Sequence, residues 1–377
     1  MLSLMARART SSELPPCYAL VWPGLEQVAA EEISDWGGEV KKTSRGVVVF
    51  RPKAIDRELL RLRTTEDVYL FAWGTDSLTY RASDLEAIQR WTARVDWQQL
   101  LRLHHAVRPR PSGKPTYRLV TQMEGKHGYL RRDAARALAR GLAGVFPDSW
   151  KPAEQNASVE VWLSIDQATA VCGMRLSDAR MRHRTYKQEH QPASLRPTIA
   201  AAMVRLARAR PGQLLVDPMC GAGTILAEQL AVDRRVRVLG GDMERSAVRM
   251  TQSNLLRLGE PDILWWDARW LPLPAASVDH IVSNPPFGKQ LSHPEAIGPL
   301  YRAMIRSYDR VLVPGGQAVL LVSDTEALQQ AIAAVGWKSL KRTHVLVLGQ
   351  MAQLSVWRKL PRPDTMIESV DNAFLPG

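Results

Sequence analysis

Residues 214–231 read LLVDPMCGAGTILAEQLA, an apolar run followed by a glycine-containing turn and then by a helical pattern. Four more strand-like runs follow, separated by helical stretches, and this alternation is typical of a parallel sheet with helices on both faces. Two β-rich runs at 339–348 and 351–359 predict a terminal hairpin. The predicted strands are 214–217, 236–242, 262–267, 278–284 and 317–323, and the predicted helices are 224–231, 244–258 and 297–313.

The first half of the chain alternates differently and predicts two small α+β units. A polar, basic and proline-containing segment from about residue 177 to 197 predicts the connection to the second half. The expected strands are 18–24, 46–50, 68–73, 116–121, 158–164 and 168–174, and the first of them runs into a turn. The expected helices are 25–36, 55–63, 84–94 and 132–145.

Composition excludes several classes of protein. The chain has 377 residues and 45% hydrophobic content, which suits two or three globular domains. No apolar stretch approaches the roughly 18 to 20 residues of a membrane span, and the first dozen residues lack an apolar core, so we expect a soluble protein without a signal peptide. Cys17, Cys172 and Cys220 form no CxxC pair, and no histidine has metal-ligand spacing. We therefore expect a cytoplasmic protein without a metal.

Charge is unevenly distributed. The formal net charge is +12, and residues 101–142 hold 10 Lys and Arg against 2 Asp and Glu. Such a local surplus is expected of a protein that binds a phosphate backbone. A solvated basic face without a partner is the alternative.

The glycine turn predicts close approach of the backbone to a ligand. Gly221 and Gly223 allow that approach and present backbone N–H groups. Leu226 occupies the third position of a dinucleotide fingerprint, which disfavours NAD or FAD, and no G-K-[ST] follows that would make a P-loop.

Acidic residues follow three successive predicted strands. Asp217 precedes the glycine turn, Asp242 comes about 20 residues after it, and Asp267-Ala268 end the third strand. Each aspartate alone is more typical of a helix N-cap. Together, at one edge of a parallel sheet, they favour an adenosine-type ligand, with Asp242 on the ribose and Asp267 near the adenine.

This arrangement resembles the class I S-adenosylmethionine-dependent methyltransferases over roughly residues 195–360, with a first motif of the form D-P-x-C-G-x-G-T. The resemblance implies a Rossmann-like α/β fold and S-adenosylmethionine as cofactor. It places Asp217 and the glycines around the methionine end of the cofactor. The residues that it implies for cofactor binding are Asp217, Gly221, Gly223, Thr224, Asp242, Met243, Asp267, Ala268 and Asn284.

The string SNPPFGK, residues 283–289, follows the fourth predicted strand. Exocyclic amines of nucleobases are poor nucleophiles, and acceptors aimed at the amine stabilise the charge that develops on it. The Asn284 side chain and the Pro285 carbonyl could accept the amine protons, and Phe287 could stack the base. A simple turn is the alternative. The string resembles [NDS]-P-P-[FYW], the signature of exocyclic-amine methyltransferases, and Cys220, in the glycine turn, is not placed for carbon methylation.

The motif alone admits adenine N6, cytosine N4, guanine N2 and protein glutamine. Residues 15–177 resemble the N-terminal module and THUMP domain of THUMP-containing RNA methyltransferases, through a G-x-H-x-Y-x-R pattern at Gly125, His127, Tyr129 and Arg131. The lead-in from His190 to Ala200 resembles that of the guanine-N2 members. The resemblance implies that the THUMP part grips the tRNA acceptor end. Residues expected to bind RNA are Arg118, Lys126, His127, Arg131 and Arg132.

These features together predict a tRNA guanine-N2 methyltransferase that acts in the acceptor stem. Alternatives are a ribosomal RNA guanine-N2 methyltransferase and a non-catalytic RNA-binding factor with a vestigial methyltransferase domain; a DNA amino-methyltransferase would leave the basic half unexplained. The expected domains are an N-terminal ferredoxin-like α+β module at 15–78, a THUMP domain at 79–177, a linker at 178–197, the methyltransferase domain at 198–360 and a tail at 361–377.

Overall fold

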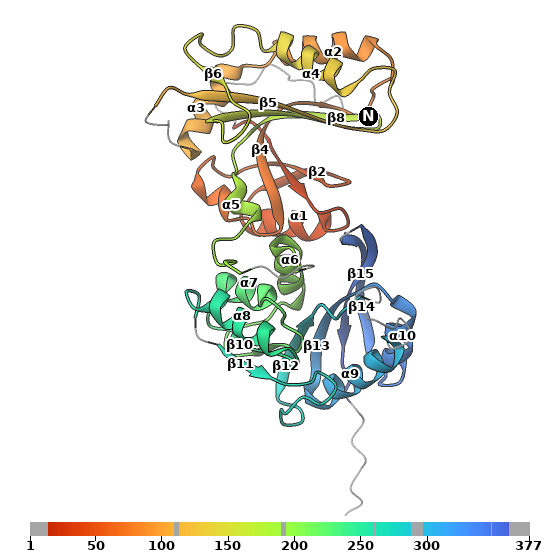
Figure 1. Cartoon of the computed structure of the whole chain (residues 1–377). Helices are drawn as coiled ribbons and strands as arrows, with labels where there is room; N and C mark the ends of the chain where they lie inside the picture. The colour runs from red at the N-terminus through yellow and green to blue at the C-terminus, as the bar shows by residue number, and fades with distance from the viewer. Residues whose placement is uncertain are drawn as a thin grey trace, which may run out of the picture. The chain divides into compact units, whose positions relative to one another are not determined.

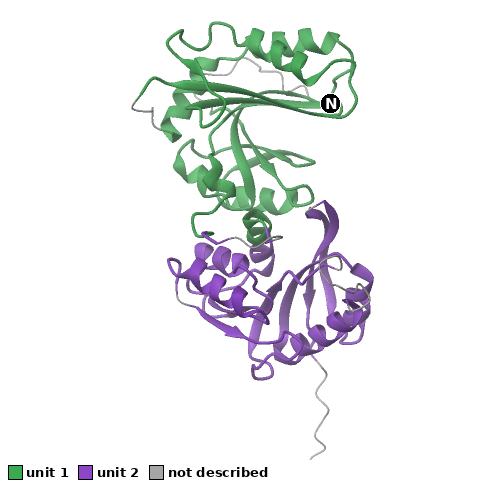
Figure 2. Cartoon of the chain, viewed as in Figure 1, with its two compact units in different colours: residues 1–187, 196–202 green, residues 188–195, 203–377 purple. Residues whose placement is uncertain are grey.

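The computed structural model describes residues 14–108, 113–189, 194–259, 261–287, 297–347 and 349–361. The chain divides into two compact units, residues 1–187 with 196–202 and residues 188–195 with 203–377 (Figure 2). Helix α6, Pro197–Ala207, spans the division. The predictions for His190 to Ala193, for Gly288-Lys289 and for the tail after residue 361 lie outside the described residues.

A single eight-stranded sheet, in the order β2-β3-β1-β4-β8-β7-β5-β6, forms the N-terminal unit (Figure 1). Strand β4 pairs antiparallel with β8, so the sheet runs without a break through both expected α+β parts. The expected boundary at residue 78 follows the end of β4, and it stays a prediction. The elements are β1 (Cys17–Val21), α1 (Glu26–Asp35), β2 (Glu39–Ser44), β3 (Val47–Arg51), the 3-10 helix η1 (Arg57–Arg61), β4 (Thr65–Thr75), α2 (Ser83–Ala93), α3 (Trp97–Val107), β5 (Thr116–Glu124), α4 (Arg131–Gly141), β6 (Lys151–Pro152), β7 (Val159–Asp166), β8 (Thr169–Arg175) and α5 (Ala179–Arg182).

A buried polar network fixes the seam between β4 and β8. Arg175 donates to Asp67 Oδ1 from Nε (2.8 Å) and Nη2 (2.6 Å), and to Glu160 Oε2 from Nη1 (3.0 Å). The Ser177 hydroxyl also donates to Asp67 Oδ1, at 2.6 Å. Because buried charges are tolerated only when they are paired, this network holds the two parts of the sheet in one register.

Several elements of the N-terminal unit were not predicted. Strand β2 (EVKKTS) alternates between exposed and half-buried positions, so it has no apolar face to reveal it. Helix α3 begins after Asp96, whose carboxylate accepts from the Gln99 amide at 2.9 Å. The helix expected at 55–63 is shorter, since only the 3-10 turn η1 forms there.

The C-terminal unit contains a seven-stranded sheet in the order β11-β10-β9-β12-β13-β15-β14, parallel except for β15, which pairs antiparallel with β13 and β14. This confirms the parallel sheet and the terminal hairpin. Helix α10 was not predicted. The elements are β9 (Leu214–Asp217), α7 (Thr224–Val232), β10 (Arg237–Asp242), α8 (Arg245–Leu255), β11 (Asp262–Trp265), β12 (Val278–Ser283), α9 (Ile297–Val311), β13 (Leu312–Val322), α10 (Thr325–Ala333), β14 (Lys338–Val347) and β15 (Gln350–Arg358).

The strand order reverses between β9 and β12. From β9 the chain moves outward through β10 to β11, and then returns to the other side of β9 as β12. In open α/β sheets, ligands bind outside the carboxyl ends of the strands at such a switch point. The glycine turn after β9 and the SNPPF string after β12 therefore lie on neighbouring strands of this edge. Within the described ranges, no helix is long and apolar enough to cross a bilayer.

Candidate active site

The turn after β9 has the backbone that its glycines require. Gly221 and Gly223 have φ values of +53° and +74°, and Gly223 is the N-cap of α7. A Cβ on Gly223 would lie 2.7 Å from Thr251 Cγ2 on α8. Glycine is therefore needed at residue 223 both for its backbone conformation and for close packing.

Hydrogen bonds tie this turn to β10 and α8. The Gly221 amide donates to Asp242 Oδ2 at 2.9 Å, and the Thr251 hydroxyl donates to the Gly221 carbonyl at 2.7 Å. Asp242 Oδ1 accepts from the Glu244 amide at 3.0 Å. The carboxylate of Asp242 is half-exposed and has lone pairs left, so it can still accept from a diol such as a ribose.

Asp217 lies at the end of β9 with its carboxyl group enclosed by protein. The residue is 1% exposed, and burial raises the pKa of its carboxyl group to about 8. The Met219 amide donates to Oδ1 at 3.3 Å and acts in the opposite direction, because this hydrogen bond lowers the pKa. The negative charge of Asp242 raises this pKa further. A buried carboxylate of this kind is stabilised by a cation placed beside it. An α-ammonium group at the glycine turn would supply that cation, so this site fits the methionine end of the expected cofactor.

Asp267, the third of the expected acidic residues, does not stand at the end of a strand. Strand β11 ends at Trp265, two residues before Asp267. Both carboxylate oxygens of Asp267 accept from the Arg269 guanidinium, and these bonds lower the pKa of Asp267. The structure thus gives Asp267 a local role in a turn, and its contact with an adenine stays a prediction. Ala268 is buried, whereas Met243 is 56% exposed beside Asp242, where an apolar side chain can cover a flat ring.

Asn284 directly follows β12, and its amide oxygen has an unsatisfied acceptor. Oδ1 is buried and makes no hydrogen bond to any described residue. An unpaired buried acceptor costs free energy, so such atoms are uncommon unless a ligand completes them. The neighbouring Ser283 hydroxyl is also buried, lowers the pKa of the Asp217 carboxyl by hydrogen bonding, and was not predicted. The structure therefore places an unpaired acceptor at the switch point, as the exocyclic-amine motif requires, and an amine can reach it only when the atoms that enclose Oδ1 move aside.

The prolines and the aromatic residue of the motif are packed tightly. Pro285 is buried, and the Tyr301 hydroxyl of α9 donates to the Pro286 carbonyl at 3.4 Å. Phe287 is only 3% exposed. The open ring face that base stacking needs is therefore not present in this conformation, which differs from the expected stacking role.

Asn254 of α8 was not predicted and holds the segment before the domain against the glycine turn. Its Oδ1 accepts from the Gln188 and Glu189 amides, each at 3.0 Å, and its Nδ2 donates to the Ala222 carbonyl at 3.0 Å. The residue is 2% exposed. An asparagine on the buried side of an amphipathic helix, near its C-terminal end, was the available signal.

Trp266 is a second residue that was missed. Its Nε1 donates to the Pro218 carbonyl at 2.9 Å, which fixes the start of the glycine turn. Gly241 on the adjacent strand leaves space for its ring, whereas Gly240 leaves space for Leu226 and Ile263. Two glycines inside an apolar strand were the signal for a close approach.

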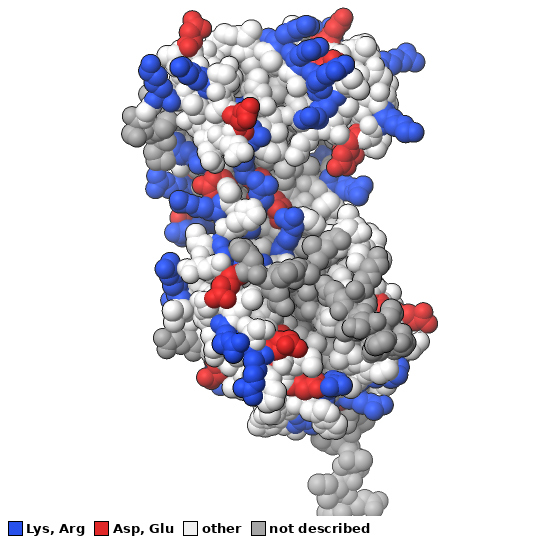
Figure 3. Space-filling view, in the orientation of Figure 1, with Lys and Arg blue, Asp and Glu red and all other residues white. Residues whose placement is uncertain are grey.

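The residues expected to bind RNA lie in the N-terminal unit. Lys126, Arg131 and Arg132 are exposed, and Arg118 on β5 is half-exposed, with its Nη1 3.9 Å from Glu160 Oε1. Figure 3 shows Lys and Arg side chains gathered over α2 and α4. His127 instead stacks on Tyr80, with ring centroids 5.0 Å apart, so the structure shows a packing role for this ring.

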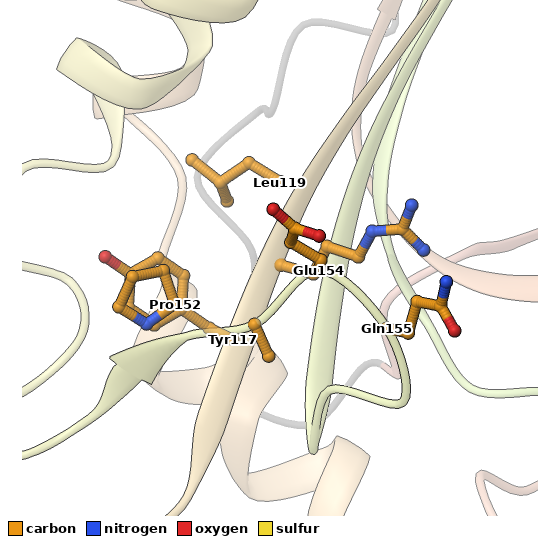
Figure 4. A pocket seen from close by; sticks show the side chains of 7 residues that line it. Tyr117, Leu119, Pro152, Glu154 and Gln155 are labelled. Atoms are coloured by element: carbon orange, nitrogen blue, oxygen red, sulfur yellow. The ribbon is translucent and has the colours of Figure 1, made fainter.

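A hollow of about 640 Å³ lies beside β5 and β6 in the same unit (Figure 4). Tyr117 and Leu119 project to one side of β5, as alternate residues of a strand do. The Tyr117 ring also stacks on Phe146 at 4.5 Å. The other lining residues are Arg118, Pro152, Ala153, Glu154 and Gln155.

A second hollow, of about 450 Å³, shares Arg118 and Gln155 with the first. Arg108, Arg175 and Arg180 add to its lining, so cations outnumber the two acidic residues there. Most of these arginines are already paired with carboxylates, so the unpaired positive charge of the N-terminal unit lies mainly on its basic helices. Among the described residues, no group of three or more His, Cys, Asp or Glu side chains could hold a metal ion.

Comparison with known proteins gives consistent results. Residues 184–353 match the family described as "RMKL-like, methyltransferase domain". The chain is 30% identical over 325 residues to a Thermus thermophilus protein named tRNA (guanine(6)-N2)-methyltransferase, covering 83% of this chain and 91% of that one. The crystal structure of TrmN from Thermus thermophilus superposes with a TM-score of 0.76 at 26% identity, covering 92% of this chain and 100% of that chain.

A mammalian relative is longer. A Bos taurus protein named tRNA (guanine(6)-N(2))-methyltransferase THUMP3 is 32% identical over 254 residues, or 63% of this chain and 50% of its own length. The chain thus spans about half the length of this relative. The matches confirm the class I methyltransferase fold of the C-terminal unit.

Proposed function

Because this chain belongs to the family of the Thermus thermophilus tRNA (guanine(6)-N2)-methyltransferase, we propose that it transfers a methyl group from S-adenosylmethionine to the N2 amine of a guanosine in the acceptor stem of tRNA. The observation that carries this proposal is the unpaired Asn284 Oδ1 next to the glycine turn. The motif alone admits other amines, and the names of the relatives favour guanine N2.

The residues of the chain suit this reaction. S-adenosylmethionine supplies an electrophilic methyl group on a sulfonium. Asp217 and the turn at Gly221 and Gly223 would hold its amino acid end, and Asp242 its ribose. Asn284 Oδ1 accepts a hydrogen bond from the guanine amine and stabilises the positive charge that grows on the nitrogen as the new bond forms. The amine proton then leaves to water, so no strong base is needed.

The N-terminal unit would hold the RNA. We assign residues 79–177 as a THUMP domain, and we expect its basic helices and hollows to bind the acceptor end of tRNA through charge and shape. The three described cysteines are buried free thiols, which suits a reducing compartment, and we propose the cytoplasm. Recovery of the tagged chain in an oxidising compartment would contradict that location.

The deciding experiment identifies the methylated nucleoside. Purified protein is incubated with labelled S-adenosylmethionine and either total tRNA or ribosomal RNA, and the RNA is then digested to nucleosides. N2-methylguanosine in tRNA alone supports the proposal. Label in ribosomal RNA alone, N6-methyladenosine, or RNA binding without any transfer would each overturn it.

A further inference from the structure

Large apolar side chains are exposed at one edge of the methyltransferase sheet. Trp270 is 83% exposed and Trp265 is 59% exposed. The Trp265 Nε1 donates to the carbonyl of Met243, which is itself exposed, at 2.8 Å. Single exposed apolar residues are ordinary, but a group that includes two tryptophans marks an interaction site. We call Trp265 and Trp270 the tryptophan pair.

The tryptophan pair lies on the carboxyl edge, where the candidate active site is. Trp265 ends β11 and pairs in register with Asp242, the last residue of β10. The Trp270 amide donates to the Asp267 carbonyl at 2.9 Å, closing a turn directly after that strand. The next residue, Leu271, donates from its amide to Ser307 Oγ of α9 at 3.0 Å. The turn that carries Trp270 thus connects the end of β11 to the helix that follows the Asn284 motif.

Cationic groups accompany the rings. The Arg245 guanidinium lies 4.3 Å from the centroid of the Trp265 ring, and Arg249 follows one helical turn later on α8. Arg269 lies next to Trp270 in the chain and is paired with Asp267. Flat aromatic faces beside guanidinium groups bind unpaired nucleotides, because every nucleotide has a base that can stack on the ring and a phosphate that the guanidinium can neutralise.

Other occupants explain these features less well. A protein partner could cover the same side chains, since Trp, Arg and Met are common at protein interfaces. However, a protein seated on this edge would obstruct the RNA that must reach Asn284. The RNA substrate is the one partner that has to approach this edge for the proposed reaction to occur.

We propose that the tryptophan pair, and Trp270 above all, stacks an unpaired base of the substrate RNA close to the nucleotide that is methylated. This inference rests on the proposed function, because it takes RNA as the substrate. Phe287 is buried in the structure, so this pair supplies exposed aromatic faces at the active-site edge that the motif itself does not. Displacing the target guanosine from its helix exposes neighbouring bases, and stacking one of them offsets part of that cost.

The test compares Trp270→Leu, which removes the aromatic face, with Trp270→Phe, which keeps one. Leu256→Ala is the matched control, since Leu256 is 68% exposed at the opposite end of α8. Binding of unmodified tRNA is measured by filter retention, and binding of S-adenosylmethionine by calorimetry. We expect Trp270→Leu to weaken RNA binding about 10- to 100-fold, Trp270→Phe to weaken it only a few-fold, and Leu256→Ala to leave it unchanged.

Cofactor affinity should be the same in all three variants. Weaker cofactor binding by Trp270→Leu would show that the Trp270 ring contacts the adenine of the cofactor instead. Loss of a dimer, measured by sedimentation, would show that the ring contacts a second copy of the chain. Equal RNA binding by Trp270→Leu and wild type would also overturn the inference. RNA binding is read without turnover, so wild-type protein that binds tRNA but produces no N2-methylguanosine would refute the proposed function and leave the stacking test valid.

Discussion

The indole of Trp266 lies directly against the backbone of Gly241, so closely that a Cβ on Gly241 would be 2.1 Å from Trp266 Cε2. The Trp266 ring is held in this position, because its Nε1 donates a hydrogen bond to the Pro218 carbonyl at the start of the glycine turn. The position of the turn therefore depends on the absence of a side chain at residue 241.

Replacing Gly241 with alanine should destabilise the protein. The added methyl group must displace the Trp266 ring, at a cost of about 1–3 kcal/mol in the free energy of unfolding. It should also weaken cofactor binding, because the turn moves with Pro218. Denaturant unfolding and calorimetry measure the two effects. Gly113→Ala is the control, since nothing lies within 4 Å of a Cβ there; equal losses in both variants would contradict the packing argument.

The buried Asp217 predicts a stability that depends on pH. The pKa of its carboxyl group rises from an ordinary 3.8 to about 8 on folding, mainly through burial. Between these values the folded state keeps a proton that the unfolded state has lost. The free energy of unfolding should therefore fall as pH rises, by up to about 1.4 kcal/mol per pH unit from this group, and should level off above about pH 8.

Asp217→Asn provides the comparison, because it removes the titrating group and keeps the shape of the side chain. Unfolding by denaturant without cofactor, from about pH 5 to about pH 8, should give a flatter curve for this variant than for the wild type. Parallel curves would show that Asp217 does not hold the proton.

The sequence predicted those parts of the site that depend on local pattern. Asp217, Asp242 and Asn284 stand at strand ends because each ends or follows a clear apolar run. The parts that depend on distant pairing were missed. Asp67 and Arg175 join β4 to β8 across 108 positions of sequence, and no local pattern indicates that pairing.

Burial at the site was also missed, because it depends on contacts between distant parts of the chain. Phe287 and Asp267 were assigned to ligands from their place in the motifs, but packing encloses the Phe287 ring, and Arg269 occupies the Asp267 oxygens. Trp266 and Asn254 were missed because their partners become visible only when the strands and helices are assembled.

Asn284→Ala should reduce turnover strongly and leave the fold intact. Because Oδ1 of Asn284 has no described partner, its removal should change the free energy of unfolding by less than about 1 kcal/mol. Loss of one preorganised group at a developing charge lowers turnover by about 100- to 1000-fold. Transfer of labelled methyl groups to tRNA and cofactor calorimetry separate the two roles, and a matching loss of cofactor affinity would mark Asn284 as structural.

Arg175→Met should be among the most destabilising changes in the N-terminal unit. The substitution leaves Asp67 and Glu160 without their buried cation, which costs about 3–5 kcal/mol. Arg118→Gln is a matched control, because Arg118 faces the same Glu160 from 3.9 Å but is 38% exposed. That variant should lose no more than about 1 kcal/mol. The difference between the two in denaturant unfolding measures the contribution of burial, and equal losses would refute it.

Basic residues of the N-terminal unit should set the salt dependence of RNA binding. Each cation that contacts a phosphate contributes about 0.7–0.9 to the slope of log K against log salt concentration. Replacing Arg118, Lys126 and Arg132 together with glutamine should therefore reduce the magnitude of that slope by about 2–3. The control removes the same number of exposed charges from the C-terminal unit, at Arg234, Arg237 and Arg257. If both triple variants change the slope equally, net charge and not this surface governs binding. A change confined to the first variant locates the phosphate contacts in the N-terminal unit.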